Sequence, residues 1–140
     1  MSGVFTVDAG VFVSGFIPSE PAHQASKAFL RQVRQSRTRL VLPTLVIVEI
    51  AAAIGRGQGK PDLGYAFALE VSRFPDLTFV PLDDDLAQEA AEMAATHRLR
   101  GSDAVYVAVA RRFAAALVTL DAEQAQRAAP VVPVRLPAPD

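Results

Sequence analysis

The sequence predicts an α/β fold in which a parallel sheet is covered by helices. Short apolar runs typical of buried strands alternate along the chain with longer segments whose apolar residues recur at helical spacing. Proline, glycine and aspartate separate most of these segments, as is usual at turns. Strands that alternate with helices form βαβ units, and parallel sheets built from such units carry helices on both faces.

The predicted strands share a short apolar run that ends at a polar or turn-forming residue. Asp8 and Gly10 end the first run, and Asp121 ends the fourth. Pro133 lies within the last run and has no backbone N–H, so this strand is expected at an edge of the sheet. The predicted strands cover residues 3–7, 39–42, 77–80, 116–120 and 131–134.

The predicted helices fill the intervals between these strands. Pro43 suits the turn before the helix at 44–56, and Gly55 and Gly57 are expected to close it. The β-branched residues at 46–48 also fit a strand. Asp83 is a predicted N-cap, and either Ser102 or Asp103 is expected to cap the helix that follows. The other predicted helices are 20–36, 62–74, the segment after Asp83, the segment to about 113 and a short one after Asp121.

Composition indicates a folded protein and excludes several classes of site. With 140 residues, the chain is expected to form one domain, 1–140, with a tail at 136–140. Its 51% hydrophobic and 21% charged residues exclude a disordered chain. The absence of cysteine excludes disulfides and thiolate metal sites. We expect both histidines, His23 and His97, at surface helix ends rather than as ligands.

The N-terminal segment does not resemble a signal peptide, because Asp8 interrupts it and no basic region precedes it. The longest apolar run, 40–54, contains Pro43 and Glu49 and is shorter than the roughly 20 residues of a membrane span. A cytoplasmic protein without a membrane partner is therefore expected.

Four carboxylates lie beside apolar runs, either at the ends of the predicted elements or within them. Burying an ionised carboxylate is costly unless it meets a cation or a network of hydrogen bonds. Taken singly, Asp8, Asp103 and Asp121 could be turn or capping residues, and Glu49 could pair with an arginine. The ends of parallel strands are, however, where open α/β sheets bind ligands. The four residues are Asp8, Glu49, Asp103 and Asp121.

If these carboxylates converge, the chemistry of the site is limited. Oxygen ligands without cysteine or histidine suit a hard cation, Mg²⁺ or Mn²⁺. Such an ion polarises a phosphoryl oxygen and lowers the pKa of bound water. Carboxylates a few ångströms apart repel one another and retain protons without it. The four acids together therefore predict a metal-dependent reaction on a phosphate ester.

Four segments, VFTVDAGVFVSGF, LVLPTLVIVEIAAAI, LRGSDAVYVAVA and ALVTLDAEQ, occur in an order and spacing that resemble the PIN domain. The resemblance covers essentially the whole chain and is strongest to the VapC-type ribonuclease toxins of toxin–antitoxin pairs. It implies a sheet in the order 3-2-1-4-5 within three layers, and an Mg²⁺- or Mn²⁺-dependent endoribonuclease. It further implies an RNA substrate, a homodimer and inhibition by a cognate antitoxin protein.

By position, the resemblance implies that Asp8, Glu49, Asp103 and Asp121 are both the catalytic and the metal-binding residues. Thr119 and Ser102 are expected to support these ligands through hydrogen bonds. The chain departs from many relatives next to the first acid, where Ala9 and Gly10 replace a polar side chain. The candidate RNA contacts are Arg98, Arg100, Lys27 and Arg31.

Two alternatives to a nuclease remain open from the sequence. The acids at 83–85 could serve a small phosphatase, although a helix start whose acids favour the helix dipole explains them as well. The four acids could instead shape a non-catalytic module that binds a metal or a partner.

The near-neutral charge of the chain does not exclude RNA binding. The net charge of −1 comes from 14 basic and 15 acidic residues. Setting aside the four clustered acids leaves 11 acidic residues against 14 basic ones, so the remaining surface is mildly basic.

Overall fold

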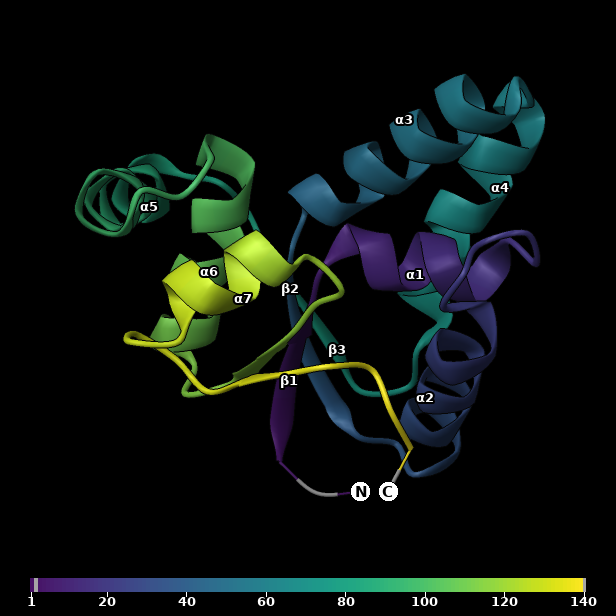
Figure 1. Cartoon of the computed structure of the whole chain (residues 1–140), viewed down its shortest axis with the longest axis horizontal. Helices are drawn as coiled ribbons and strands as arrows, with labels where there is room; N and C mark the ends of the chain where they lie inside the picture. The colour runs from purple at the N-terminus through teal and green to yellow at the C-terminus, as the bar shows by residue number, and fades with distance from the viewer. Residues whose placement is uncertain (2, 140) are drawn as a thin grey trace.

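The computed structural model describes Met1 and residues 3–139. Within these residues, five parallel strands form one sheet in the order β3-β2-β1-β4-β5 (Figure 1). This confirms the predicted α/β class and strand order. The strands are β1 (Val4–Val7), β2 (Arg39–Pro43), β3 (Leu77–Val80), β4 (Ala116–Val118) and β5 (Val134–Arg135).

Helices cover both faces of this sheet. They are α1 (Ala9–Phe16), α2 (His23–Gln35), α3 (Leu45–Gln58), α4 (Pro61–Glu70), α5 (Asp84–His97), α6 (Gly101–Arg112) and α7 (Ala122–Ala128), with a 3-10 turn, η1 (Val71–Arg73), after α4. In Figure 1, α5, α6 and α7 lie to one side of the strands, and α1, α2 and α4 lie to the other. In the part of the chain that is described, no helix is long and apolar enough to cross a membrane.

Helices bury the central strands on both faces, which explains why the sequences of these strands are continuous apolar runs. Helix α6 packs on β1, β2 and β4, while α1 packs against α2 and α3. Val7, Leu40, Leu42 and Leu117 are fully buried, as expected for strands covered on both faces. The order of the strands places β1 in the centre of the sheet, so the residue that follows it, Asp8, lies at the middle of the carboxyl edge.

Helix α1 was not predicted from the sequence. Its eight residues begin directly after β1, and the Asp8 side chain accepts a hydrogen bond from the backbone N–H of Gly10 at 3.3 Å. A capped helix of two turns is too short for its apolar residues to display a clear helical period, since all faces but one are buried.

The segment at 44–56 is a helix and not a strand, and it extends further than predicted. Gly55 and Gly57 lie inside α3, which ends at Gly59 in the left-handed conformation with φ of 64°. Helix α4 packs closely against α3 at Gly55, where Gly64 approaches the Gly55 backbone.

Three other predicted boundaries are wrong by a few residues. Helix α2 begins at His23, because residues 17–22 form turns. Arg100 caps α6, so that Ser102 and Asp103 lie in its first turn rather than at its cap. Strand β5 starts after Pro133, whose carbonyl accepts a hydrogen bond from the backbone N–H of Leu117 at 2.8 Å. The edge position of this strand is as predicted.

The remaining elements differ only slightly from the prediction. Strand β4 ends at Val118, two residues early, and the predicted helix at 62–74 divides into α4 and the turn η1. The predicted strand end at Leu42 extends to Pro43.

The crossing of α3 and α4 gives a testable packing prediction. A Cβ atom at Gly64 would lie 2.8 Å from the carbonyl oxygen of Ala51 and 2.9 Å from the backbone nitrogen of Gly55. Because both neighbours are backbone atoms, Gly64→Ala should cost roughly 1–3 kcal/mol of unfolding free energy in a denaturant titration. Gly57→Ala is the control, since its Cβ would meet nothing within 4 Å and alanine favours a helix. Equal stability of the two variants would contradict the close packing.

Candidate acidic active site

A cavity of about 650 Å³ lies at the carboxyl edge of the central strands. The predicted acids in its lining come from three segments that are far apart in the sequence. Asp8 follows β1, Glu49 lies in the second turn of α3, and Asp103 lies in the first turn of α6. Arg100 and Ser102, at the start of α6, also line the cavity. Three of the four predicted acids therefore share one cavity.

Asp121, the fourth predicted acid, is outside the residues that line the cavity but close to it, since Leu120 is part of the lining. Asp121 caps α7, and its Oδ1 accepts hydrogen bonds from the backbone N–H groups of Glu123 and Gln124 at 3.0 and 3.1 Å. Its charge nevertheless raises the pKa of both Asp8 and Asp103. The capping and functional interpretations of this residue are therefore compatible.

The electrostatics of the cavity are those of crowded carboxylates. Burial, and next the charge of Glu49, raise the pKa of Asp8 to about 7, against the lowering effect of the Gly10 N–H. Burial and the charge of Asp121 also raise the pKa of Asp103, while Arg100 opposes this rise. Such a cluster favours the binding of protons or of a cation.

Glu49 is held by a hydrogen bond from a buried tyrosine. The Tyr106 hydroxyl donates to Glu49 Oε1 at 2.6 Å, and the tyrosine side chain is fully buried in α6. Burial and the neighbouring carboxylate raise the pKa of Tyr106, so its hydroxyl keeps the proton that it donates. This contact links α6 to α3 and fixes the direction of the Glu49 carboxylate.

Thr119 and Ser102, the predicted supporting residues, have different surroundings. Thr119 is buried, donates from Oγ1 to Gln124 Oε1 at 2.7 Å and accepts a hydrogen bond from the backbone N–H of Asp121 at 3.0 Å. It thereby orders the turn that carries Asp121. Ser102 lines the cavity beside Asp103.

Of the four basic residues predicted to contact RNA, Arg100 lines the acidic cavity. Lys27 and Arg31 line a separate cavity of about 260 Å³ between α1, α2 and the α4–η1 segment. Arg98 has a positive φ of 58° at the end of α5, and its carbonyl accepts a hydrogen bond from Arg127.

The cavity fits a divalent cation by the chemistry of its donors, which are carboxylate oxygens, and neighbouring carboxylates raise the pKa of both Asp8 and Asp103. Among Met1 and residues 3–139, no three acidic or histidine side chains already converge closely enough to hold one ion.

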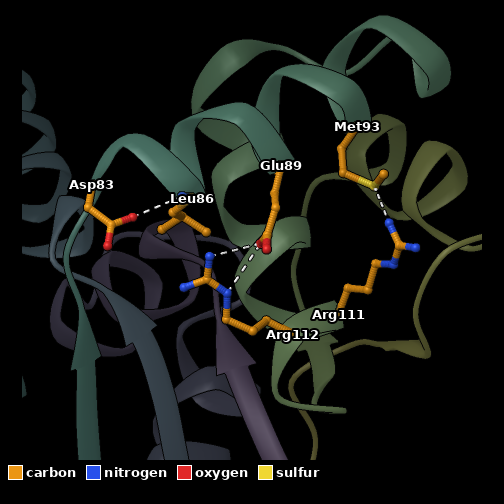
Figure 2. A network of polar contacts seen from close by, with 6 residues as sticks. All are labelled: Asp83, Leu86, Glu89, Met93, Arg111 and Arg112. Atoms are coloured by element: carbon orange, nitrogen blue, oxygen red, sulfur yellow. Dashed lines mark hydrogen bonds and ion pairs between the residues drawn. The ribbon is translucent and has the colours of Figure 1, made fainter.

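The acids at 83–85 lie outside this cavity. Asp83 caps α5, and its Oδ1 accepts a hydrogen bond from the backbone N–H of Leu86 at 2.9 Å (Figure 2). Nearby, Glu89 forms an ion pair with Arg112 at 3.0 Å, which joins α5 to α6. These contacts agree with a structural role for the acidic helix start.

Comparison with protein-family models matches residues 5–130 to the PIN domain. The chain is a PIN domain. This agrees with the resemblance of its four sequence segments and with the observed strand order. A comparison with curated proteins found no match.

Several solved structures are similar in fold to this PIN domain. VapC20 of Mycobacterium tuberculosis, described as a toxin that cleaves the sarcin–ricin loop, is 18% identical, with a TM-score of 0.76 over 94% of this chain and 98% of that one. VapBC2 of Rickettsia felis, bound to promoter DNA, is 11% identical, with a TM-score of 0.70 over 95% and 98%. FitAcB of Neisseria gonorrhoeae is 16% identical, with a TM-score of 0.61 over 95% and 97%.

Sequence reasoning missed several residues around the cavity of this PIN domain. Tyr106 lies three residues after Asp103, a helical spacing that could have indicated a shared face. Ser14 and Glu20 line the cavity from α1 and the loop after it, but neither belonged to a recognised motif. His23 was expected at the surface, yet it is buried and its Nδ1 contacts the Ser14 carbonyl at 2.9 Å.

Proposed function

We propose that this PIN domain is a metal-dependent endoribonuclease and the toxin of a type II toxin–antitoxin pair. The observation that carries the proposal is the cavity lined by Asp8, Glu49 and Asp103, in which burial and the charge of Glu49 raise the pKa of Asp8 to about 7. A protein gains nothing in stability from gathering like charges, so such a cluster indicates a function. VapC20, which is similar in fold and is described as cleaving the sarcin–ricin loop, supports RNA as the substrate class.

Asp8, Glu49 and Asp103 would hold Mg²⁺ or Mn²⁺, with Asp121 adding negative charge beside them. When bound, the ion would activate water and stabilise the charge on the phosphate during cleavage of the phosphodiester bond. Arg100 is the cation of the lining and would attract the RNA phosphate. Tyr106 would keep the Glu49 carboxylate directed toward the cavity.

The direct test of this proposal is RNA cleavage with and without divalent ions. Purified protein should cleave RNA in Mg²⁺ or Mn²⁺, and EDTA should abolish cleavage until an excess of the ion is restored. Cleavage that persists in EDTA would contradict the role of the metal. A complete lack of RNA cleavage in either ion would instead favour a non-catalytic binding module.

Tyr106→Phe tests the support of Glu49. Loss of the hydroxyl should lower the cleavage rate and raise the Mg²⁺ concentration for half-maximal rate, each by about 10-fold, since groups that orient metal ligands typically contribute this much or more. Tyr65→Phe is the matched control, because Tyr65 is exposed on α4. A purely structural role of Tyr106 would lower thermal stability and leave the Mg²⁺ dependence unchanged.

We propose that residues 1–140 act as a single PIN domain in the cytoplasm, as a homodimer that a cognate antitoxin inhibits. Large apolar side chains are exposed on the α3–α4 hairpin, at Val48, Tyr65 and Leu69. Tyr65 and Leu69 are four residues apart and thus share a face of α4. Exposed apolar groups of this kind support a protein partner. The solved structures of VapBC2 and FitAcB, both similar in fold, are consistent with an antitoxin partner.

A further inference from the structure

The acidic cavity continues into a second cavity along helix α3. This second cavity is open and has a volume of about 430 Å³. Ala53 lines both cavities, so the two adjoin. The lining of the second cavity comes from α3 alone and consists of Ala52, Ala53, Arg56 and Gly57. Together with Glu49, these residues form one surface, the α3 face, from the candidate metal site to the last turn of the helix.

Helical register explains why these residues share a surface. Ala53 and Arg56 follow Glu49 by four and seven residues, spacings that place side chains on one side of a helix. Seven residues of helix correspond to about 10.5 Å. In Figure 1, α3 runs away from α6 toward its hairpin with α4, so Arg56 lies at the far end of the α3 face. A chain molecule that lies along this face from Glu49 therefore reaches Arg56.

The side chains between the two charged residues are too small to block the α3 face. Ala52, Ala53 and Gly57 carry no more than a methyl group, and all three are exposed. Helix α4 packs on a different side of α3, where Gly64 approaches the backbone of Gly55. The packing of α4 therefore does not explain these small residues, and the space above them is open to a ligand.

Arg56 gives the α3 face a positive end. Its side chain is exposed and lines the second cavity, whose lining within the described chain includes no acidic residue. Throughout Met1 and residues 3–139, no ion pair engages the Arg56 guanidinium. A guanidinium without an acidic partner is available to bind a phosphate through two parallel hydrogen bonds. The α3 face thus runs from the carboxylates of the candidate metal site to an available cation.

We propose that the α3 face binds the backbone of the RNA strand beside the cleaved bond, and that Arg56 binds one of its phosphates. The proposal rests on the ribonuclease function proposed above. RNA fits this face because it carries a phosphate at every nucleotide, so one strand matches both the proposed metal site and a cation about 10.5 Å away. At a rise of about 3.4 Å for each stacked nucleotide, Arg56 lies within about three nucleotides of the cut.

A phosphate contact positions the RNA and carries no sequence information. Arg56 should therefore contribute equally to the cleavage of RNAs of different sequence. It lies too far along α3 from Glu49 to touch the reacting phosphate, so its contribution should appear in the binding of RNA and not in the chemical step.

Arg56→Gln tests this contact in steady-state cleavage of one labelled RNA in Mg²⁺, measured at several KCl concentrations. The KM should rise about 5-fold, and kcat should change by less than about 2-fold. The slope of log KM against log salt concentration should fall by about 0.7, the value for one phosphate contact on a single strand. Arg56→Lys should keep the wild-type slope, because lysine retains the charge.

Arg39→Gln is the matched control. Arg39 is also exposed, but it begins β2 and so lies at the opposite edge of the sheet from the acidic cavity. Its KM and salt dependence should equal those of the wild type. Because Arg56 lies in the last turn of α3, it could instead only stabilise the helix end. A lower melting temperature of Arg56→Gln with a wild-type KM and salt slope would show this and overturn the proposal.

A second measurement replaces single phosphates of that RNA with uncharged methylphosphonates, one position at a time. At one position within about three nucleotides of the cut, the replacement should raise the KM of the wild type about 5-fold and leave that of Arg56→Gln nearly unchanged. Equal effects on the two proteins at every position would overturn the contact and leave the nuclease function standing. Absence of RNA cleavage by the wild type would overturn both.

Discussion

Asp8→Asn should make the metal-free protein more stable at pH 8. Asp8 has a pKa of about 7 in the folded protein against 3.8 in a model peptide, so the folded state holds the proton more tightly than the unfolded chain. The resulting penalty on folding is absent below about pH 4 and grows as the pH rises. It is complete above about pH 7, where it is of the order of 4 kcal/mol for a bare carboxylate. Asparagine removes this charge and still accepts the hydrogen bond from the Gly10 N–H.

Thermal unfolding in EDTA at pH 5 and pH 8 measures this effect. From pH 5 to pH 8, the wild type should lose stability relative to Asp8→Asn, and the variant should melt several degrees higher at pH 8. Asp76→Asn serves as the control, since Asp76 lies before β3 and outside the cavity. A melting temperature of Asp8→Asn below that of the wild type at pH 8 would show that the crowded carboxylates do not destabilise the folded protein.

Asp103→Asn should lower the rate of RNA cleavage by about a hundred- to a thousandfold, the effect typical of removing one group that stabilises charge in the transition state. The residue lines the cavity in the first turn of α6, and burial and the Asp121 charge raise its pKa. Asparagine preserves the size of the side chain and keeps only one of its oxygens as an acceptor. Single-turnover cleavage of a labelled RNA in Mg²⁺ measures the change.

Asp83→Asn is the matched control for this loss. Asp83 also stands at the start of a helix, but it lies outside the cavity and caps α5. Its variant should lose some stability, roughly 1 kcal/mol or less, and retain RNA cleavage. If Asp83→Asn loses activity while Asp103→Asn keeps it, the site belongs to the acids at 83–85, as the phosphatase alternative requires.

Much of the fold could be predicted because the central strands are short, apolar and bounded by turns. Leu40–Leu42 and Leu117 are buried in a sheet that is covered on both faces. Their strands are therefore continuous apolar runs, which are easy to recognise in the sequence. Helix α1 was missed because it is short and buried on most sides. Strand β5 was misplaced because its two residues, Val134 and Arg135, are only half-buried and follow a proline.

The candidate site could be predicted in part because acids beside apolar runs stand out in a sequence. Glu49 was expected to meet a cation, a hydrogen-bond network or a metal, and the structure provides the Tyr106 hydroxyl from 57 residues away. Such a contact depends on how α3 and α6 pack, which no local pattern reveals. The same holds for Glu20, whose place in the cavity follows from the turn after α1.

The central claim is that Asp8 and its neighbouring acids hold the metal ion on which RNA cleavage depends. Its most direct test compares the wild type with Asp8→Asn. For each protein, the rate of cleavage of one labelled RNA is measured as a function of Mg²⁺ concentration. Asp8 lies at the middle of the carboxyl edge and feels the charge of all three other acids. The wild-type rate should rise from zero with Mg²⁺ and saturate, while the variant should stay at least a hundredfold slower at every concentration. Equal rates for the two proteins, or wild-type cleavage independent of Mg²⁺, would contradict the account.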